Sequence, residues 1–158
     1  MLAAIAAALA AADPDHAEDF RANAALMQAD LAALTEDLES TLAPSKTIPF
    51  LVFHDAYGYF VERFGLTAVG AIALNPERPP GAARVAEIHR RVADLGVVCV
   101  FSEPQFPPKL ITVVMEGTDA RSGVLDPLGT ALPAGPEAYG QLLRDLAASL
   151  RSCLLTES

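Results

Sequence analysis

From residue 50 onward, short apolar runs alternate with longer segments of helical spacing, and this alternation is the feature that most constrains the fold. The apolar runs predict strands near 50–53, 67–74, 97–101 and 123–125. The segments after them predict helices near 56–64, 81–95, 107–116 and 136–153. Strands that alternate with helices are typical of βαβ units, whose strands run parallel and whose sheet is covered on both faces. We therefore expect an α/β fold with a parallel four-stranded sheet and helices on both faces.

The segment before the sheet is predicted to be helical. Residues 1–12 are rich in alanine and place Leu2, Ile5 and Leu9 on one helical face. That face has no obvious partner earlier in the chain, so we expect the chain to begin within a larger protein. Asp13 and Pro14 then predict the end of this helix and the start of a second one. Asp13 is its expected N-cap, and the second helix runs to about residue 42.

Composition excludes some classes of partner. The chain has 158 residues, of which 52% are hydrophobic and 20% charged, which fits a packed domain rather than a disordered chain. Its formal net charge is −9, and no stripe of Lys and Arg interrupts the acidic balance. Nucleic acids and anionic membrane surfaces would be repelled, so we expect no nucleic-acid partner.

Three polar residues fall at the carboxyl ends of predicted strands: His54 after the first, Glu103 after the third and Asp126 after the fourth. In a parallel sheet these positions share the carboxyl edge, where α/β proteins bind ligands. An imidazole and a carboxylate that converge there suit zinc, which takes nitrogen and oxygen ligands.

Each candidate also has a purely structural interpretation. His54 is as compatible with a half-buried, hydrogen-bonded histidine as with a metal ligand. Asp126 precedes a proline and could open a turn. Glu103 could start a helix or form a surface ion pair. For Asp55, the neighbour of His54, we expect the role of N-cap of the next helix.

The remaining histidines and the cysteines do not define a catalytic site. His16 and His89 lack a partner four residues along and are expected to be structural. The two cysteines, Cys99 and Cys153, could be buried free thiols or a disulfide pair. No Gly-x-Ser-x-Gly elbow, phosphate-binding glycine loop or His-Glu-x-x-His motif is present, so we assign no catalytic residue.

Blocks of sequence in the same order resemble a known family, the zinc-binding solute-binding proteins of ABC transporters of the ZnuA type. The similar blocks are FHDAYGYF at 53–60, FGL at 64–66, CVFSEPQF at 99–106 and LDPLG at 125–129. The resemblance implies two α/β lobes joined by one rigid helix, with the metal in the cleft between them. Residues 1–12 then correspond to a helix of an absent first lobe, 13–45 to the connecting helix and 46–158 to the C-terminal metal-binding lobe.

The same resemblance implies roles for individual residues. His54 matches the third of the family's zinc-binding histidines, and Asp126 matches the carboxylate beside the metal, a direct ligand in manganese-binding relatives. Glu103 is expected to orient a ligand or a water. Cys99 and Cys153 match a pair that forms a disulfide in many zinc-binding members.

The resemblance implies high-affinity capture of zinc in the periplasm and its delivery to an ABC permease, without catalysis. The zinc site is expected to be incomplete in this chain, and the N-terminal helices could mediate self-association. Three rival interpretations remain: a metal-dependent hydrolase that uses His54 and Asp126 with Glu103 as base, a manganese-binding relative, and an adhesion module.

Overall fold

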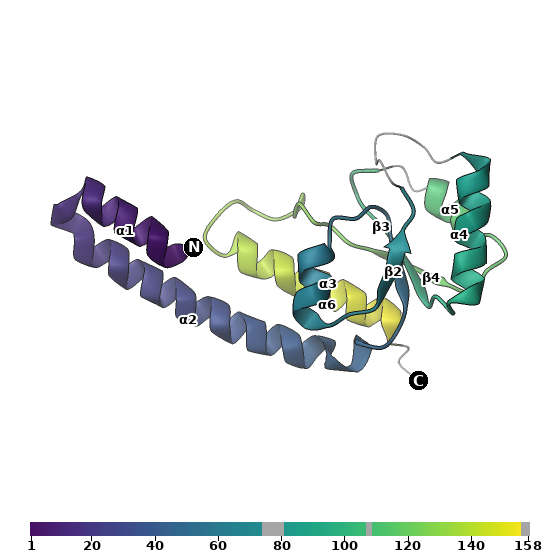
Figure 1. Cartoon of the computed structure of the whole chain (residues 1–158), viewed down its shortest axis with the longest axis horizontal. Helices are drawn as coiled ribbons and strands as arrows, with labels where there is room; N and C mark the ends of the chain where they lie inside the picture. Colours follow the sequence, from purple (N-terminus) through teal and green to yellow (C-terminus); the bar gives the residue numbers. More distant parts are fainter. Residues whose placement is uncertain (74–80, 107–108, 156–158) are drawn as a thin grey trace. The chain divides into compact units, whose positions relative to one another are not determined.

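The computed structural model describes residues 1–73, 81–106 and 109–155. The chain divides into two compact units, residues 1–37 and 38–158, and the division falls within one long helix (Figure 1). None of the helices in the described ranges is both long and apolar enough to cross a membrane.

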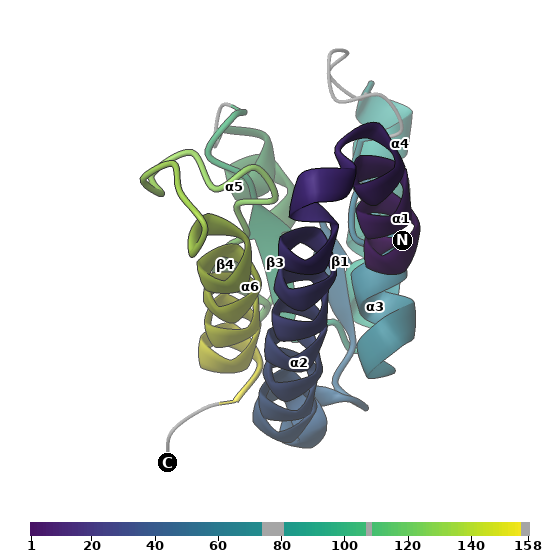
Figure 2. The ribbon, with the colours of Figure 1, turned by 90° about the vertical axis from the view of Figure 1, so that its left-hand side faces the viewer.

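The first unit is a pair of helices joined by a tight turn. Helix α1 (Leu2–Ala12) runs back beside the N-terminal part of helix α2 (Ala17–Leu42), as Figures 1 and 2 show. Ala6 and Ala10 are its buried residues, and such small side chains let two helices approach closely. The side chains of Ile5 and Leu9, which share the apolar face predicted from the sequence, are 48% and 44% exposed.

The long helix is confirmed, but its start differs from the prediction. Residues Pro14–His16 form a 3-10 turn, η1, and the α-helix begins at Ala17. Asp13 makes no capping bond from its side chain, because its Oδ2 atom lies 2.9 Å from Nδ1 of His16 instead. Helix α2 has 26 residues, which corresponds to a length of about 39 Å.

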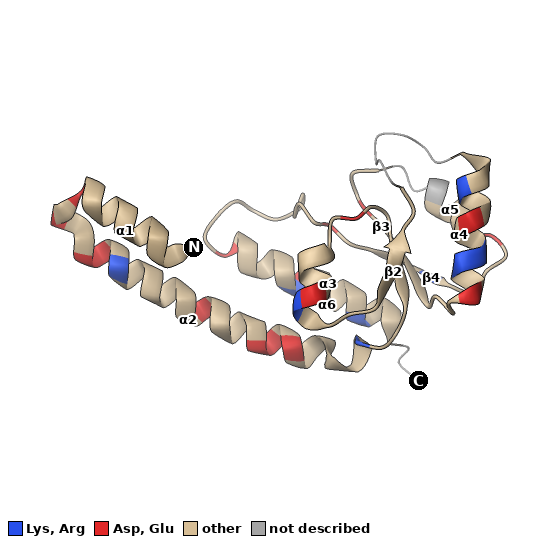
Figure 3. Cartoon of the chain, viewed as in Figure 1, with Lys and Arg blue, Asp and Glu red and all other residues tan. Residues whose placement is uncertain are grey.

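Acidic side chains dominate α2. Figure 3 shows them spaced along the helix. The helix has one basic residue, Arg21, and its acidic residues are Glu18, Asp19, Asp30, Glu36, Asp37 and Glu39.

The second unit contains the predicted parallel sheet, with strand order β2-β1-β3-β4. The strands are β1 (Phe50–Val52), β2 (Ala68–Ala71), β3 (Cys99–Ser102) and β4 (Arg121–Val124), and every pairing is parallel. Strand β4 begins two residues before the predicted start at 123. Its sequence, Arg-Ser-Gly-Val, lacks an apolar run because it lies at the edge of the sheet, where its side chains are half-buried or exposed in alternation.

Four helices cover the sheet, as predicted. Helices α4 (Ala82–Asp94) and α5 (Lys109–Met115) lie on one face, and α3 (Gly58–Phe64) and α6 (Ala138–Leu154) lie on the other (Figures 1 and 2). The helix predicted at 107–116 is thus observed from Lys109, and residues 107–108 lie outside the described ranges, as does residue 74 of the second predicted strand.

Successive residues of the central strands point to opposite faces, so each face has its own core. On the side of α4 and α5, apolar side chains form one buried cluster: Leu51, Phe53, Ile72, Ala73, Ile88, Val92, Val97, Val100, Ile111 and Val114. On the side of α6, the rings of Phe50 and Phe101 meet edge to face with their centroids 5.7 Å apart.

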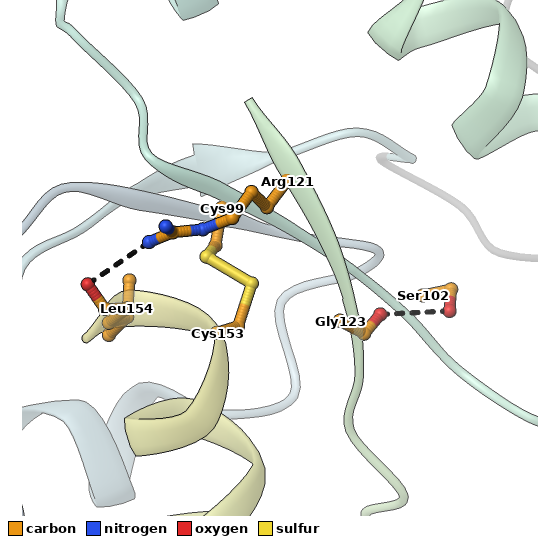
Figure 4. Close-up of a disulfide and its surroundings, with 6 residues drawn as sticks. All are labelled: Cys99, Ser102, Arg121, Gly123, Cys153 and Leu154. Carbon is orange, nitrogen blue, oxygen red and sulfur yellow. Dashed lines mark hydrogen bonds between the residues drawn. A yellow bond between two sulfur atoms is a disulfide. The ribbon is translucent and has the colours of Figure 1, made fainter. Parts of the chain in front are cut away.

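A disulfide joins Cys99 in β3 to Cys153 in α6, which confirms the pairing implied by the resemblance (Figure 4). Their Cα atoms are 6.2 Å apart, a distance that a disulfide readily spans. Nearby, a guanidinium N–H of Arg121 donates to the carbonyl oxygen of Leu154 at 3.3 Å, so the end of α6 is tied to β4 as well as to β3.

The outer edge of β2 is covered by two arginines of α4. Arg91 donates to the carbonyl oxygen of Val69 at 2.8 Å, and Arg84 donates to that of Ala71 at 2.8 Å. An edge strand offers unpaired backbone groups to other chains, and charged side chains that bind those groups block such pairing.

Candidate metal centre

The three polar residues predicted to follow strands do lie after parallel strands, at the carboxyl edge of the sheet. His54 follows β1, Glu103 follows β3 and Asp126 follows β4. Strands β1 and β3 are neighbours although β2 comes between them in the sequence. The chain therefore reverses its direction of winding between β1 and β3, and such a switch point is where open α/β sheets bind ligands.

His54 and Glu103 form a hydrogen-bonded pair at this switch point. Nδ1 of His54 lies 2.7 Å from Oε1 of Glu103. The Glu103 side chain is 1% exposed and that of His54 is 26% exposed, so the carboxylate is buried and the imidazole reaches the surface. An ionised carboxylate only accepts hydrogen bonds, which places the proton of a neutral ring on Nδ1 and leaves the lone pair on Nε2.

Aromatic rings hold the imidazole in place. Phe53 and Phe106 stack with their centroids 4.5 Å apart, and the ring of His54 meets Phe106 edge to face at 5.9 Å. Phe106 belongs to the same loop as Glu103. The loop after β3 therefore supplies both a hydrogen-bond acceptor and an apolar wall to one histidine.

Tyr57, in the loop after β1, lies near this pair, with its ring centroid 6.5 Å from that of His54. It is 6% exposed, and its hydroxyl lies 3.5 Å from the carbonyl oxygen of Leu125 in the loop after β4. Burial raises the pKa of its phenol, and the neighbouring carboxylates of Glu103 and Asp126 raise that pKa further. Tyr57 therefore remains a neutral donor next to two carboxylates.

Asp126 organises the turn that follows β4. Its Oδ1 accepts hydrogen bonds from the backbone N–H groups of Leu128 and Gly129 and from the side-chain amide of Gln105, and its Oδ2 accepts two from Thr130. Partial burial acts to raise the pKa of this carboxyl, but the hydrogen bonds, chiefly from Thr130 and Gln105, outweigh it and lower the pKa. The turn-forming interpretation of Asp126 is thus observed.

The prediction for Asp55 is wrong. Helix α3 begins at Gly58 after Tyr57, and no side chain caps it. The N–H of Ala56 bonds to the carbonyl oxygen of His54 at 2.9 Å, so the chain turns sharply here and leaves Asp55 exposed at the turn. Tyr57, two residues after Asp55, is buried.

The other two histidines make hydrogen bonds outside this centre. The ring of His89 lies with Nε2 2.8 Å from the carbonyl oxygen of Val113, and His16 pairs with Asp13. Two residues of the centre were missed from the sequence, Tyr57 and Gln105. Both stand in the blocks that carry the resemblance, but their partners lie in other loops.

Within the described ranges, no three His, Cys, Asp or Glu side chains are grouped closely enough to hold a metal ion. The structure brings His54 and Glu103 into contact. Asp126 is connected to the loop of Glu103 through Gln105. The arrangement offers one imidazole nitrogen, Nε2 of His54, on a ring that is oriented by the buried carboxylate of Glu103.

Fold and centre together define a class of protein: an α/β lobe that presents an oriented imidazole at the switch point of a parallel sheet. The family model described as "Zinc-uptake complex component A periplasmic" matches residues 1–153, and the chain belongs to this family.

Similar proteins include the high-affinity zinc uptake system protein ZnuA of Brucella abortus, which is 52% identical over 98% of this chain and 46% of its own length. A crystal structure of ZnuA superposes with a TM-score of 0.80 at 26% identity, covering 96% of this chain and 54% of that one. The laminin-binding protein Lbp of Streptococcus pyogenes superposes with a TM-score of 0.78 at 29% identity, and the match covers 96% of this chain and 58% of that one. The chain spans about half the length of the curated relatives it matches.

Proposed function

We propose that this chain supplies the C-terminal half of the metal cleft of a periplasmic zinc-capture protein, which passes the ion to an ABC permease. Membership of the zinc-uptake family supports this function. The observation that carries it is the hydrogen-bonded pair of His54 and Glu103 at the switch point of the sheet. Zinc is cargo here, so no reaction is catalysed.

In this proposal Nε2 of His54 is a zinc ligand. Glu103 holds the ring by its Nδ1–H, which orients the lone pair of Nε2 and raises its basicity, as carboxylates do for many zinc-binding histidines. The buried, nearly inaccessible carboxylate of Glu103 orients the ligand and does not itself reach the ion.

Asp126 is the proposed second ligand. Its hydrogen bonds keep the carboxylate ionised, which is the form that binds a cation. Those same bonds occupy most of its lone pairs, because two carboxylate oxygens offer about four acceptor sites. Zinc would therefore compete with these hydrogen bonds for the oxygens of Asp126. In the alternative form of this role, Asp126 lies beside the ion without binding it directly.

Two ligands form half of a tetrahedral zinc shell. We assign residues 46–158 to the metal-binding lobe, 13–45 to a connecting helix and 1–12 to a neighbouring lobe that contributes further ligands. Zinc binding by these 158 residues alone should then be weak compared with that of a complete cleft.

The test is a zinc titration of the whole chain by competition with a chromophoric chelator. His54→Ala should weaken binding about 10- to 100-fold or more, a range typical of a lost ligand or its orienting partner. His16→Ala, which removes an exposed histidine of the first unit, is the matched control and should leave the affinity unchanged. Equal affinities of the original chain and His54→Ala would exclude this centre, and a titration with Mn²⁺ distinguishes a manganese-binding protein.

The proposal includes self-association through the N-terminal helices. The first unit exposes several large apolar residues, among them Met1, Ile5, Leu9 and Leu26. Contiguous exposed apolar surface favours association. Light scattering should show a dimer that dissociates in the double variant Ile5→Glu, Leu9→Glu, and a concentration-independent monomer would refute this part.

A further inference from the structure

The Glu103 carboxylate has one oxygen for which the described residues supply no partner. Oε1 binds His54, but Oε2 is buried and has no partner at hydrogen-bonding geometry. A buried unpaired carboxylate oxygen is costly, because it has lost its water without a replacement. A donor within reach of Oε2 would remove that cost.

The phenol of Tyr57 is a donor close to this carboxylate, since its ring centroid lies 6.5 Å from that of the His54 ring that Glu103 binds. It lies beside the Glu103 carboxylate and is itself buried. Its other partner, the carbonyl oxygen of Leu125, is 3.5 Å away, which is long for an O–H···O hydrogen bond, whose usual length is about 2.7–2.8 Å. A hydrogen bond to a carboxylate is roughly twice as strong as one to a neutral carbonyl.

We propose that Tyr57 is a positioning residue whose hydroxyl donates to Oε2 of Glu103 and thereby fixes His54 with its proton on Nδ1 and its lone pair on Nε2. Tyr57, Glu103 and His54 would then form a chain of hydrogen bonds, called the relay below. Tyr57 and His54 belong to the loop after β1, and Glu103 between them belongs to the loop after β3. With both oxygens of Glu103 bound, the carboxylate cannot rotate away from the imidazole. The significance of this relay for zinc rests on the function proposed above, whereas the hydrogen bonds do not.

A sharp turn after His54 separates the imidazole from Tyr57 in the chain. The turn at His54–Ala56 comes just before Tyr57, whose ring centroid lies 6.5 Å from that of the imidazole three residues earlier.

The test uses Tyr57→Phe, which removes the hydroxyl and keeps the ring. In the metal-free chain, ¹⁵N spectra should show His54 changing from one tautomer with a slowly exchanging Nδ1–H to a mixture with fast exchange. The zinc dissociation constant should rise roughly 3- to 10-fold, below the full effect of losing a direct orienting partner. Tyr139→Phe, at an exposed tyrosine of α6, is the control and should change neither quantity. Unchanged His54 signals in Tyr57→Phe would overturn the proposal.

A double-variant cycle and a measurement on the unaltered chain complete the test. If the hydroxyl acts through Glu103, Tyr57→Phe should have little further effect on His54 in a Glu103→Gln background. In the unaltered chain at low temperature, a Tyr57 hydroxyl proton should be visible and shifted downfield, and its absence would refute the bond even if a variant failed to fold. Because the His54 spectra are recorded without metal, a failure of zinc binding and a failure of the relay are separate results.

Discussion

Cys153, near the end of α6, is covalently bonded to Cys99 at the start of β3, 54 positions earlier in the chain. This bond ties the last helix to the centre of the sheet, and it encloses all of β3, β4 and α5.

Reduction of this disulfide should lower the free energy of unfolding by about 2–4 kcal/mol, because a closed loop of this length restricts the unfolded chain. Urea unfolding with and without reductant measures the difference. The double variant Cys99→Ala, Cys153→Ala should unfold at the same urea concentration in both conditions. Two free thiols in the unfolded, unreduced chain would contradict the bond.

Gly123 in β4 lies against the ring of Phe101, and a Cβ added there would overlap that ring and lie 3.3 Å from Cβ of Cys153. Gly123→Ala should therefore destabilise the protein by about 1–3 kcal/mol, the usual range for overpacking. Gly58→Ala is the matched control, since a Cβ at Gly58 has no neighbour within 4 Å. Thermal unfolding should show a lower Tm for Gly123→Ala alone, and equal values would refute the contact.

The hydrogen bonds to Asp126 predict a dependence of stability on pH. They lower the pKa of this carboxyl in the folded state below its unfolded value. Asp126 therefore stabilises the fold above about pH 4, and this contribution is lost as the pH falls through the folded-state pKa.

Asp126→Asn should then cost about 1–2 kcal/mol at pH 7, because the amide replaces a charged acceptor. The difference from the unaltered chain should shrink as the pH falls from 5 to 3. Urea unfolding at several pH values measures it. Asp119→Asn, at an exposed aspartate, controls for the loss of a surface charge, and a difference that does not vary with pH would contradict the assignment.

The arginines that cover the edge of β2 predict a change in association. Removing both, in Arg84→Ala with Arg91→Ala, frees the carbonyl oxygens of Val69 and Ala71. The exposed strand edge should then pair with other chains, so sedimentation should show concentration-dependent aggregates. Arg90→Ala, from the exposed face of the same helix, should sediment like the unaltered chain.

The sequence by itself determined the class of fold and the edge of the sheet that carries the candidate centre. Strand and helix periods are local, so alternating runs were enough to predict parallel strands covered on both faces. The positions of His54, Glu103 and Asp126 followed because each lies at the carboxyl end of a strand, and parallel strands share one carboxyl edge. The blocks around them identified the family and the pair Cys99 and Cys153.

Only the tertiary structure decided how these residues act on one another. That Glu103 is buried against His54 depends on β1 and β3 being neighbours, which spacing along the chain does not specify. The oxygens of Asp126 accept hydrogen bonds from its own turn. Tyr57 is buried where the first turn of a helix capped by Asp55 was expected. Hydrogen bonds between loops depend on which strands are neighbours and on how each turn is packed. Burial of the whole sheet determines the strand order and the packing of the turns, and local propensity does not.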